Sequence, residues 1–221
     1  MKNITALLFL LTISFTALCQ PAKIARYLSK QDAFIMTLSS DNWLKLPAAF
    51  DSKPIRSRGF SLYLMNEKMD SIGVFGIGYG IGFSSQNVHT NAFISDSSGQ
   101  VILTKIPDSL HYSLNKTALN FIDFAFELRF HSHPDHREKV YKLSVGIKGG
   151  YLLQSHTKYE DDNGKIKTYG IKELNKFQYG ITGRIGYSKV ALSMYYSLIP
   201  VFKKNHAPEM TVMSVGIGLA L

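Results

Sequence analysis

Cysteine is almost absent from this sequence, which has a single thiol among 221 residues. That residue, Cys19, ends an N-terminal apolar segment, and a chain cleaved directly after it would carry no cysteine. Without cysteine there are no disulfides, no thiol nucleophile and no thiolate metal ligands. Thiol chemistry is therefore excluded from the mature protein that the sequence predicts.

Long apolar runs are also missing. No stretch of about 18 apolar residues occurs, which argues against a transmembrane helix, and apolar residues do not recur with the helical period. Nevertheless 45% of the residues are hydrophobic, which is enough to build one domain with a substantial buried surface. The apolar residues are therefore expected on strands.

The N-terminus has the pattern of a secretory signal. A short basic start at residues 1–3 precedes an apolar core at residues 4–18, and small residues flank the cleavage point. Lipidation of Cys19 is an alternative, but Leu18 before it is too bulky for the usual lipidation signal. The predicted division is a signal peptide at residues 1–19, a periplasmic leader at 20–30 and one domain at 31–221.

Charge is not concentrated anywhere along the chain. The formal net charge is +9, yet the basic residues are spread over most segments without a block of like charge. A nucleic-acid partner usually requires a basic stripe or patch, so none is expected. Attraction to anionic head groups accounts for the charge, and outer-membrane lipids and lipopolysaccharide are the expected lipid partners.

What the sequence does contain is one strand made of glycine and large apolar residues. Residues 71–85 read S-I-G-V-F-G-I-G-Y-G-I-G-F-S-S, with glycine at every even position from 76 to 82. Only a strand places alternate residues on opposite faces. Because glycine is a poor strand former, four glycines on one face indicate a place where bulk does not fit. A large apolar face backed by a small-residue face is typical of a narrow transmembrane β-barrel.

Seven other segments can be interpreted as strands, many with a similar alternation. The predicted strands are residues 32–40, 57–67, 71–85, 117–131, 140–154, 177–187, 190–200 and 210–221. The connections between them are alternately long and short until the last, which is of medium length, and outer-membrane barrels combine long loops on one side with short turns on the other. The sequence therefore predicts an all-β fold, an eight-stranded antiparallel up-and-down transmembrane β-barrel. We expect it in the outer membrane of a Gram-negative bacterium, with both termini periplasmic.

A soluble lipocalin-like barrel is the alternative architecture. Such a barrel also has eight strands, but its apolar face points inward. On a soluble exterior the recurring glycines would weaken the strands for no gain. The small-residue face, the aromatic residues near strand ends and the signal sequence all favour the membrane barrel, whose apolar face meets lipid.

In a membrane barrel the polar face of the strands lies in the lumen. An eight-stranded barrel is only wide enough for side chains to fill, and charges buried there must pair. We therefore predict a luminal network of ion pairs that leaves no large pore, with Glu127 and Lys148 as the preferred contact. The predicted luminal charges are Asp123, Glu127, Arg129, Lys142, Lys148 and Arg184.

Two motifs resemble ligand sites but have simpler interpretations. Residues 131–136, H-S-H-P-D-H, could ligate a metal through His131 and His133, yet Pro134 forces a turn and a solvated polar turn is favoured. The sequence G-I-G-Y-G of residues 76–80 lacks the G-x-G-x-x-G spacing of a dinucleotide site. No cofactor and no metal are therefore expected.

An enzyme that modifies lipid A is the main catalytic alternative. It would need a Ser, a His and a carboxylate converging near the outer rim. No spacing singles out such a triad, so no catalytic residue is assigned and the protein is expected not to be an enzyme. The residues available near the long loops are Ser84, Ser85, His89, Asp108, His111 and His156.

Trp43 is the only tryptophan. Together with the aromatic residues of the apolar face it could form a ligand platform. Anchoring at the membrane interface is the favoured interpretation, because tryptophan is enriched there.

Several short phrases recur in a known family. They are D-N-W-L at residues 41–44, S-R-G-F at 57–60, E-L-R-F at 127–130, G-Y at 150–151 with S-H-T-K-Y at 155–159, R-I-G-Y at 184–187 and Y-Y-S-L at 195–198. In this order they resemble the PorT-like outer-membrane β-barrel family of the Bacteroidetes lineage. The resemblance implies an integral outer-membrane protein and a part in protein export by the type IX secretion route. Barrels of this kind usually end on an aromatic residue, whereas this chain ends on Leu221.

The expected function follows from these points. The chain is predicted to be a non-enzymatic barrel that supports protein secretion or envelope assembly, with secretion or envelope proteins as partners. A surface adhesin or ligand receptor is the first alternative, and a lipid A-modifying enzyme is the second.

Overall fold

The computed structural model describes residues 33–97, 100–107, 109–162 and 164–221. The predicted signal peptide and leader lie outside the described residues. The strands are β1 (Phe34–Leu44), β2 (Arg58–Met69), β3 (Phe75–His89), β4 (Ala92–Ser97), β5 (Gln100–Lys105), β6 (Tyr112–His131), β7 (Tyr141–Asp161), β8 (Gly164–Tyr169), β9 (Phe177–Tyr187), β10 (Val190–Ser197) and β11 (Thr211–Ala220). No helix in the described part of the chain is long and apolar enough to span a membrane.

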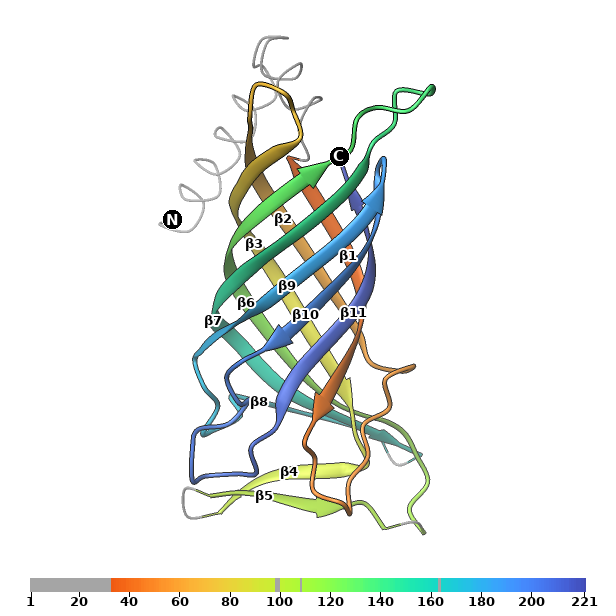
Figure 1. The fold of residues 1–221 in the computed structure, drawn as a ribbon. Helices are drawn as coiled ribbons and strands as arrows, with labels where there is room; N and C mark the ends of the chain where they lie inside the picture. The colour runs from red at the N-terminus through yellow and green to blue at the C-terminus, as the bar shows by residue number, and fades with distance from the viewer. Residues whose placement is uncertain (1–32, 98–99, 108, 163) are drawn as a thin grey trace, which may run out of the picture.

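Eight of these strands close into a barrel (Figure 1). The order around the barrel is β1, β2, β3, β6, β7, β9, β10 and β11, and every neighbouring pair is antiparallel. Pairing of β1 with β11 joins the first strand to the last and removes the free edge. The predicted eight-stranded antiparallel transmembrane barrel is confirmed.

The two ends of the barrel differ. At one end, here called the turn end, the connections are residues 70–74, 132–140 and 188–189. At the other, the loop end, they are residues 45–57, 90–111, 162–176 and 198–210. The start of β1 and the end of β11 both lie at the turn end, where Phe34 and Leu221 exchange backbone hydrogen bonds of 2.9 and 2.8 Å.

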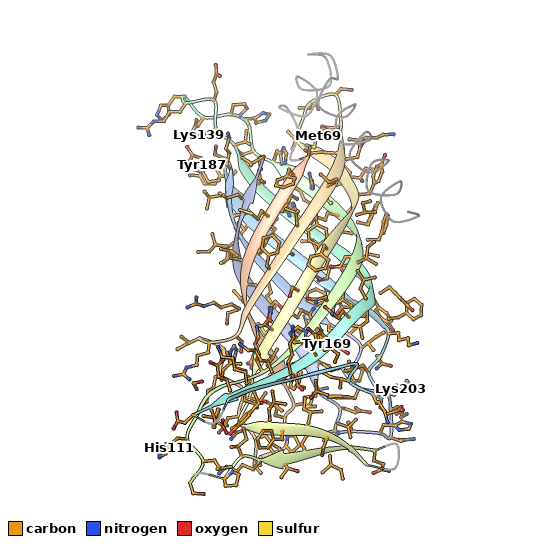
Figure 2. All side chains as sticks on the ribbon, turned by 180° about the vertical axis from the view of Figure 1, so that it is seen from behind. Met69, His111, Lys139, Tyr169, Tyr187 and Lys203 are labelled. Carbon is orange, nitrogen blue, oxygen red and sulfur yellow. The ribbon has the colours of Figure 1, made fainter. Side chains whose placement is uncertain are left out.

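The apolar face of the strands points outward (Figure 2). Phe75 and Phe126 are 42% and 37% exposed, and the apolar residues at alternating positions of the neighbouring strands are exposed as well. A soluble barrel would bury these side chains, so the lipocalin-like alternative is wrong. The exposed belt needs hydrocarbon around it.

Three strands were not predicted from the sequence. β4 and β5 form a separate hairpin inside the connection between β3 and β6, and β8 pairs with the extended end of β7. All six residues of β8 are exposed, so it has no buried face to produce an alternating pattern.

The first strand is longer than predicted. It continues to Leu44, whereas the sequence suggested a break at Asp41. Asp41 is fully buried and points inward, as does Trp43 two residues later. The break was expected because residues 41–56 contain Pro47 and Pro54, but the strand ends only at Leu44, before the first of these prolines.

The loop end is closed by a hydrophobic cluster that we call the loop-end cap. Trp43 is 3% exposed and packs edge-to-face against Phe202, with 6.4 Å between ring centroids. The predicted interfacial role of Trp43 is therefore wrong, because its ring lies inside the barrel mouth. The buried members of the cap are Trp43, Val88, Val101, Leu119, Phe121, Leu174, Val201, Phe202, Met210 and Val212.

Candidate functional site

The largest fully buried side chain of the described residues is a guanidinium in the lumen. Arg129 on β6 is 0% exposed, and its Nη1 atom lies 3.3 Å from Oε2 of Glu67 on β2. Its Nη2 atom lies 3.0 Å from Oε2 of Glu127, which is also 2.7 Å from Nη2 of Arg184 on β9. Two carboxylates and two guanidiniums therefore balance in charge, as burial in a narrow barrel requires.

Two of these ion pairs cross an intervening strand, and glycine makes the crossing possible. β3 separates Arg129 from Glu67, and there Gly78 lies directly opposite both Glu67 and Glu127, with the Arg129 side chain across it. A Cβ atom on Gly78 would lie 2.5 Å from Nε of Arg129 and 2.8 Å from its Cζ. Gly146 of β7 plays the same part beneath Glu127, with 2.9 Å between a Cβ atom there and Cγ of Glu127. The luminal glycines thus lie directly beneath the charged side chains of the network.

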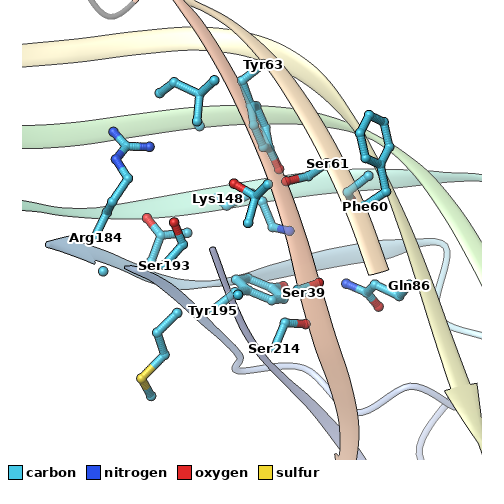
Figure 3. Close-up of a pocket in the computed structure, with 18 of the residues that line it drawn as sticks. Ser39, Phe60, Ser61, Tyr63, Gln86, Lys148, Arg184, Ser193, Tyr195 and Ser214 are labelled. Atoms are coloured by element: carbon cyan, nitrogen blue, oxygen red, sulfur yellow. The ribbon is translucent and has the colours of Figure 1, made fainter. Parts of the chain in front are cut away.

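A second charge group lies nearer the loop end, around Lys148 (Figure 3). Its Nζ atom lies 3.7 Å from Oδ2 of Asp123, which also accepts a hydrogen bond of 2.7 Å from the Tyr63 hydroxyl. The same ammonium lies 3.7 Å from the ring centroid of Tyr195. The predicted contact between Lys148 and Glu127 is wrong, because the register places Lys148 opposite Ala125, between Asp123 and Glu127, and the arginines occupy Glu127.

Of the six predicted luminal charges, five lie in these two groups. Lys142 is the sixth; it is half-buried on the luminal face, directly opposite His131, near the turn end. Sequence reasoning missed Glu67, Tyr63 and Tyr195. Glu67 could have been found because it lies an even number of residues from Tyr63 and therefore on the same face of β2, but the alternation of that strand is weak.

Beside the charge groups lies a cavity of about 90 Å³, whose lining includes Glu127 and Lys148. A single water molecule needs roughly 10–15 Å³, so the space fits several. Its lining also includes Gln86, Thr182 and Ser193, each with a buried oxygen that has no hydrogen-bond partner among the described residues. Water molecules in the cavity could satisfy these oxygens.

The cap is attached to the barrel by polar side chains as well as by packing. The Asn115 amide donates to the carbonyl oxygens of Thr90 and Ala92 at 2.9 and 2.8 Å, which holds the start of β4. The Asn175 amide donates to the carbonyl oxygens of Pro200 and Phe202 at 2.8 and 2.9 Å. Each amide thus joins two loop-end segments into one surface.

The candidate catalytic residues of the loop end do not converge in the described structure. Ser84 faces the lumen, whereas Ser85, His89 and His156 lie on the outer face of their strands. Asp108 lies outside the described residues. The wall of the barrel separates Ser84 from both imidazoles, so a nucleophile activated by either histidine cannot be built from Ser84. Oγ of Ser85 accepts a hydrogen bond of 3.2 Å from the Asn87 amide rather than from a histidine.

The histidine-rich turn at the turn end is organised by Asp135 rather than by a metal. Its Oδ1 atom accepts backbone hydrogen bonds of 2.8 Å from Arg137 and 2.9 Å from Lys139. The Tyr187 hydroxyl donates to its Oδ2 atom, and this bond together with the backbone bonds lowers the pKa of Asp135. Within the described ranges, no group of three or more His, Cys, Asp or Glu side chains is placed to hold a metal ion.

The lumen is therefore filled by ion pairs at one level and covered by the cap at the other. We expect the purified protein in a planar lipid bilayer to show no stepwise current of the size that a porin gives, because an eight-stranded barrel is only wide enough for side chains to fill and ion pairs occupy its described lumen. A porin reconstituted in the same lipid is the control. Stable open channels of porin conductance would show that the charge network does not close the barrel.

Comparison with known proteins agrees with this geometry. No curated protein matches the sequence. Residues 58–203 match a family described as outer membrane protein beta-barrel domain. This match covers most of the barrel, from β2 through β10, and the lipid-facing belt and closed lumen are what such a domain needs. The chain therefore belongs to the outer membrane protein beta-barrel domain family and is an outer-membrane protein.

Proposed function

We propose that the protein is a non-enzymatic scaffold of the outer membrane that supports protein secretion or envelope assembly in a PorT-like manner. In this proposal the turn end and both termini face the periplasm, and the loop end faces outside. The observation that carries it is the folded loop end, whose connections pack on a shared apolar cap above a closed lumen. A surface held in one shape suits protein recognition.

Two hairpins give this surface its shape. β8 pairs with β7 along one side only, and every residue of β8 is exposed, so its other side is a free edge. A free edge can accept a strand from a partner, while Lys165 and Lys167 on it disfavour pairing with a second copy. The β4–β5 hairpin lies across the loop end below β8 (Figure 1) and packs on the end of β7 through Phe93 and Tyr159, with ring centroids 4.9 Å apart.

A surface receptor or adhesin is the second candidate. The same exposed edge and hairpin support it, because a ligand of the cell exterior would meet them first. A lipid A-modifying enzyme has less support, since Ser84 lies on the opposite face of the wall from the histidines and Ser85 is hydrogen-bonded to Asn87.

The test separates secretion from ligand reception. A deletion strain is complemented with the wild-type gene or with a variant in which residues 92–105 are replaced by a short Gly-Ser link. Loss of type IX cargo from the cell surface in the deletion strain, and its failure to return with the variant, is the expected result. A matched variant replaces the turn residues 132–137 and keeps the loop end intact.

Both variants must show the heat-dependent electrophoretic shift of a folded barrel before export is scored. Unchanged cargo export and surface maturation in the deletion strain would contradict the secretion role. Crosslinking from the β8 edge would then identify whether an external ligand is bound instead.

A further inference from the structure

Four basic side chains stand in one row across four strands at the loop end. The register pairs His89 of β3 with Lys116 of β6, Lys116 with Lys158 of β7, and Lys158 with Lys167 of β8. Residues directly opposite in antiparallel strands share one face and lie about 4.5–5.5 Å apart at Cβ. We call these four residues the basic row.

The basic row lies on the outer face of the wall. On β6 the outward positions run from Lys116 through Asn120 to Ile122, which is 50% exposed in the lipid-facing belt. On β7 the neighbouring residue Tyr159 points to the other side, where it contacts Phe93 of β4. The hairpin of β7 and β8 therefore turns its lysines away from the β4–β5 hairpin and onto the surface that continues the belt.

The charge of the row is only partly balanced among the described residues. Glu160 lies 3.2 Å from Lys158 and 3.1 Å from Lys165, so one carboxylate serves two ammonium groups. Lys116 contacts a neutral group, with Nζ 3.0 Å from Oδ1 of Asn87. Like charges directly opposite one another destabilise a sheet, so this arrangement has a cost in the isolated protein.

More positive charge lies beside the row. Lys53, Arg56 and Arg58 from the first loop and the start of β2 act electrostatically on His89. Just below, between the row and the apolar belt, the Asn120 amide donates to Oε1 of Gln154 at 3.1 Å. The order from the membrane outward is thus apolar side chains, amides, then cations.

We propose that the basic row is a binding site for the phosphate groups of an anionic outer-leaflet glycolipid. Ammonium groups supply the charge for phosphate, and the amides of Asn120 and Gln154 can reach sugar hydroxyls between phosphate and hydrocarbon. The acyl chains of the same lipid then lie on the apolar belt beneath. The choice of leaflet rests on the proposed orientation, while the phosphate chemistry rests on the row itself.

The test measures binding of fluorescent bisphosphorylated lipid A to the folded, detergent-solubilised full chain. Each lysine near an anionic lipid surface contributes about fivefold to affinity. The triple variant Lys116→Gln, Lys158→Gln, Lys167→Gln is expected to bind about 150-fold more weakly than the wild type. The double variant Lys116→Gln, Lys158→Gln, which keeps Lys167, is expected to bind about 30-fold more weakly. The matched control removes three exposed lysines of the loop end away from the row: Lys45→Gln, Lys203→Gln, Lys204→Gln.

The control should bind within twofold of the wild-type protein, and lipid A lacking phosphate should bind the wild type as weakly as the triple variant binds the phosphorylated form. If the control variant bound lipid A as weakly as the triple variant, the site would be overturned, and net charge alone would account for the binding. The site would also be overturned if inorganic phosphate at millimolar concentration abolished the binding of phosphorylated lipid A while lipid A lacking phosphate still bound tightly. If the triple variant does not fold, the binding of the double variant Lys116→Gln, Lys158→Gln tests the site instead. Cargo export is scored separately, so failure of lipid binding leaves the secretion proposal standing.

Discussion

Replacing Arg129 with methionine is expected to lower the free energy of unfolding by about 3–5 kcal/mol, the largest effect of any single charge removal in this chain. Arg129 is fully buried and contacts both Glu67 and Glu127. Methionine fills much of the same volume but leaves two carboxylates close together without their shared cation. The loss is therefore caused by uncompensated charge rather than by a cavity.

The measurement is unfolding in urea in detergent, followed by the shift between folded and unfolded bands on a cold gel. Arg137→Met is the control, since Arg137 is exposed in the turn and the expected change is within about 0.5 kcal/mol. Adding Glu67→Gln to Arg129→Met should recover part of the loss, because one of the two carboxylates that lose their arginine partner is then removed. A wild-type midpoint for Arg129→Met would contradict the assignment of this network as a structural element.

Gly80→Val is expected to prevent the barrel from closing. Gly80 faces the lumen opposite Met65. A Cβ atom there would overlap the carbonyl oxygen of Leu64 and lie 2.7 Å from Sδ of Met65. A backbone oxygen cannot move aside cheaply, so the cost exceeds the roughly 1–3 kcal/mol of ordinary overpacking.

Gly183→Val is the matched control for that substitution. Gly183 lies on β9 at an outward position, and nothing lies within 4 Å of a Cβ atom built there. The same side chain should therefore be tolerated, and its β-branched shape suits a strand. The expected readout is a heat-modifiable folded band for Gly183→Val and its loss for Gly80→Val. Equal folding of the two variants would show that the luminal glycines are not required for packing.

Much of the barrel follows from alternation along single strands. In residues 71–85 the large apolar side chains and the glycines separate by parity alone, and parity says which residues share a face. The lengths of the connections then fix which end carries the loops. β8 escaped this reasoning because its exposed residues carry no contrast between two environments.

The luminal contacts depend on register and could not be predicted from parity. Glu127 and Lys148 are on the same face of adjacent strands, but Lys148 contacts Asp123, while Glu127 is reached by Arg184 from beyond β7. A side chain as long as that of arginine extends across a glycine on the adjacent strand and reaches a residue on the strand beyond it. Such contacts join residues that no pairing of neighbouring strands would suggest.

The sequence by itself therefore determined the eight-stranded alternation, the lipid-facing side and five of the charges in the two luminal groups, because a period of two assigns every side chain to a face. Only the tertiary structure decided which charges pair, that Trp43 lies inside the cap rather than at the membrane interface, and that His89, Lys116, Lys158 and Lys167 form one row. The physical reason is that shear between strands sets the register, and register is a property of the closed barrel rather than of any one segment.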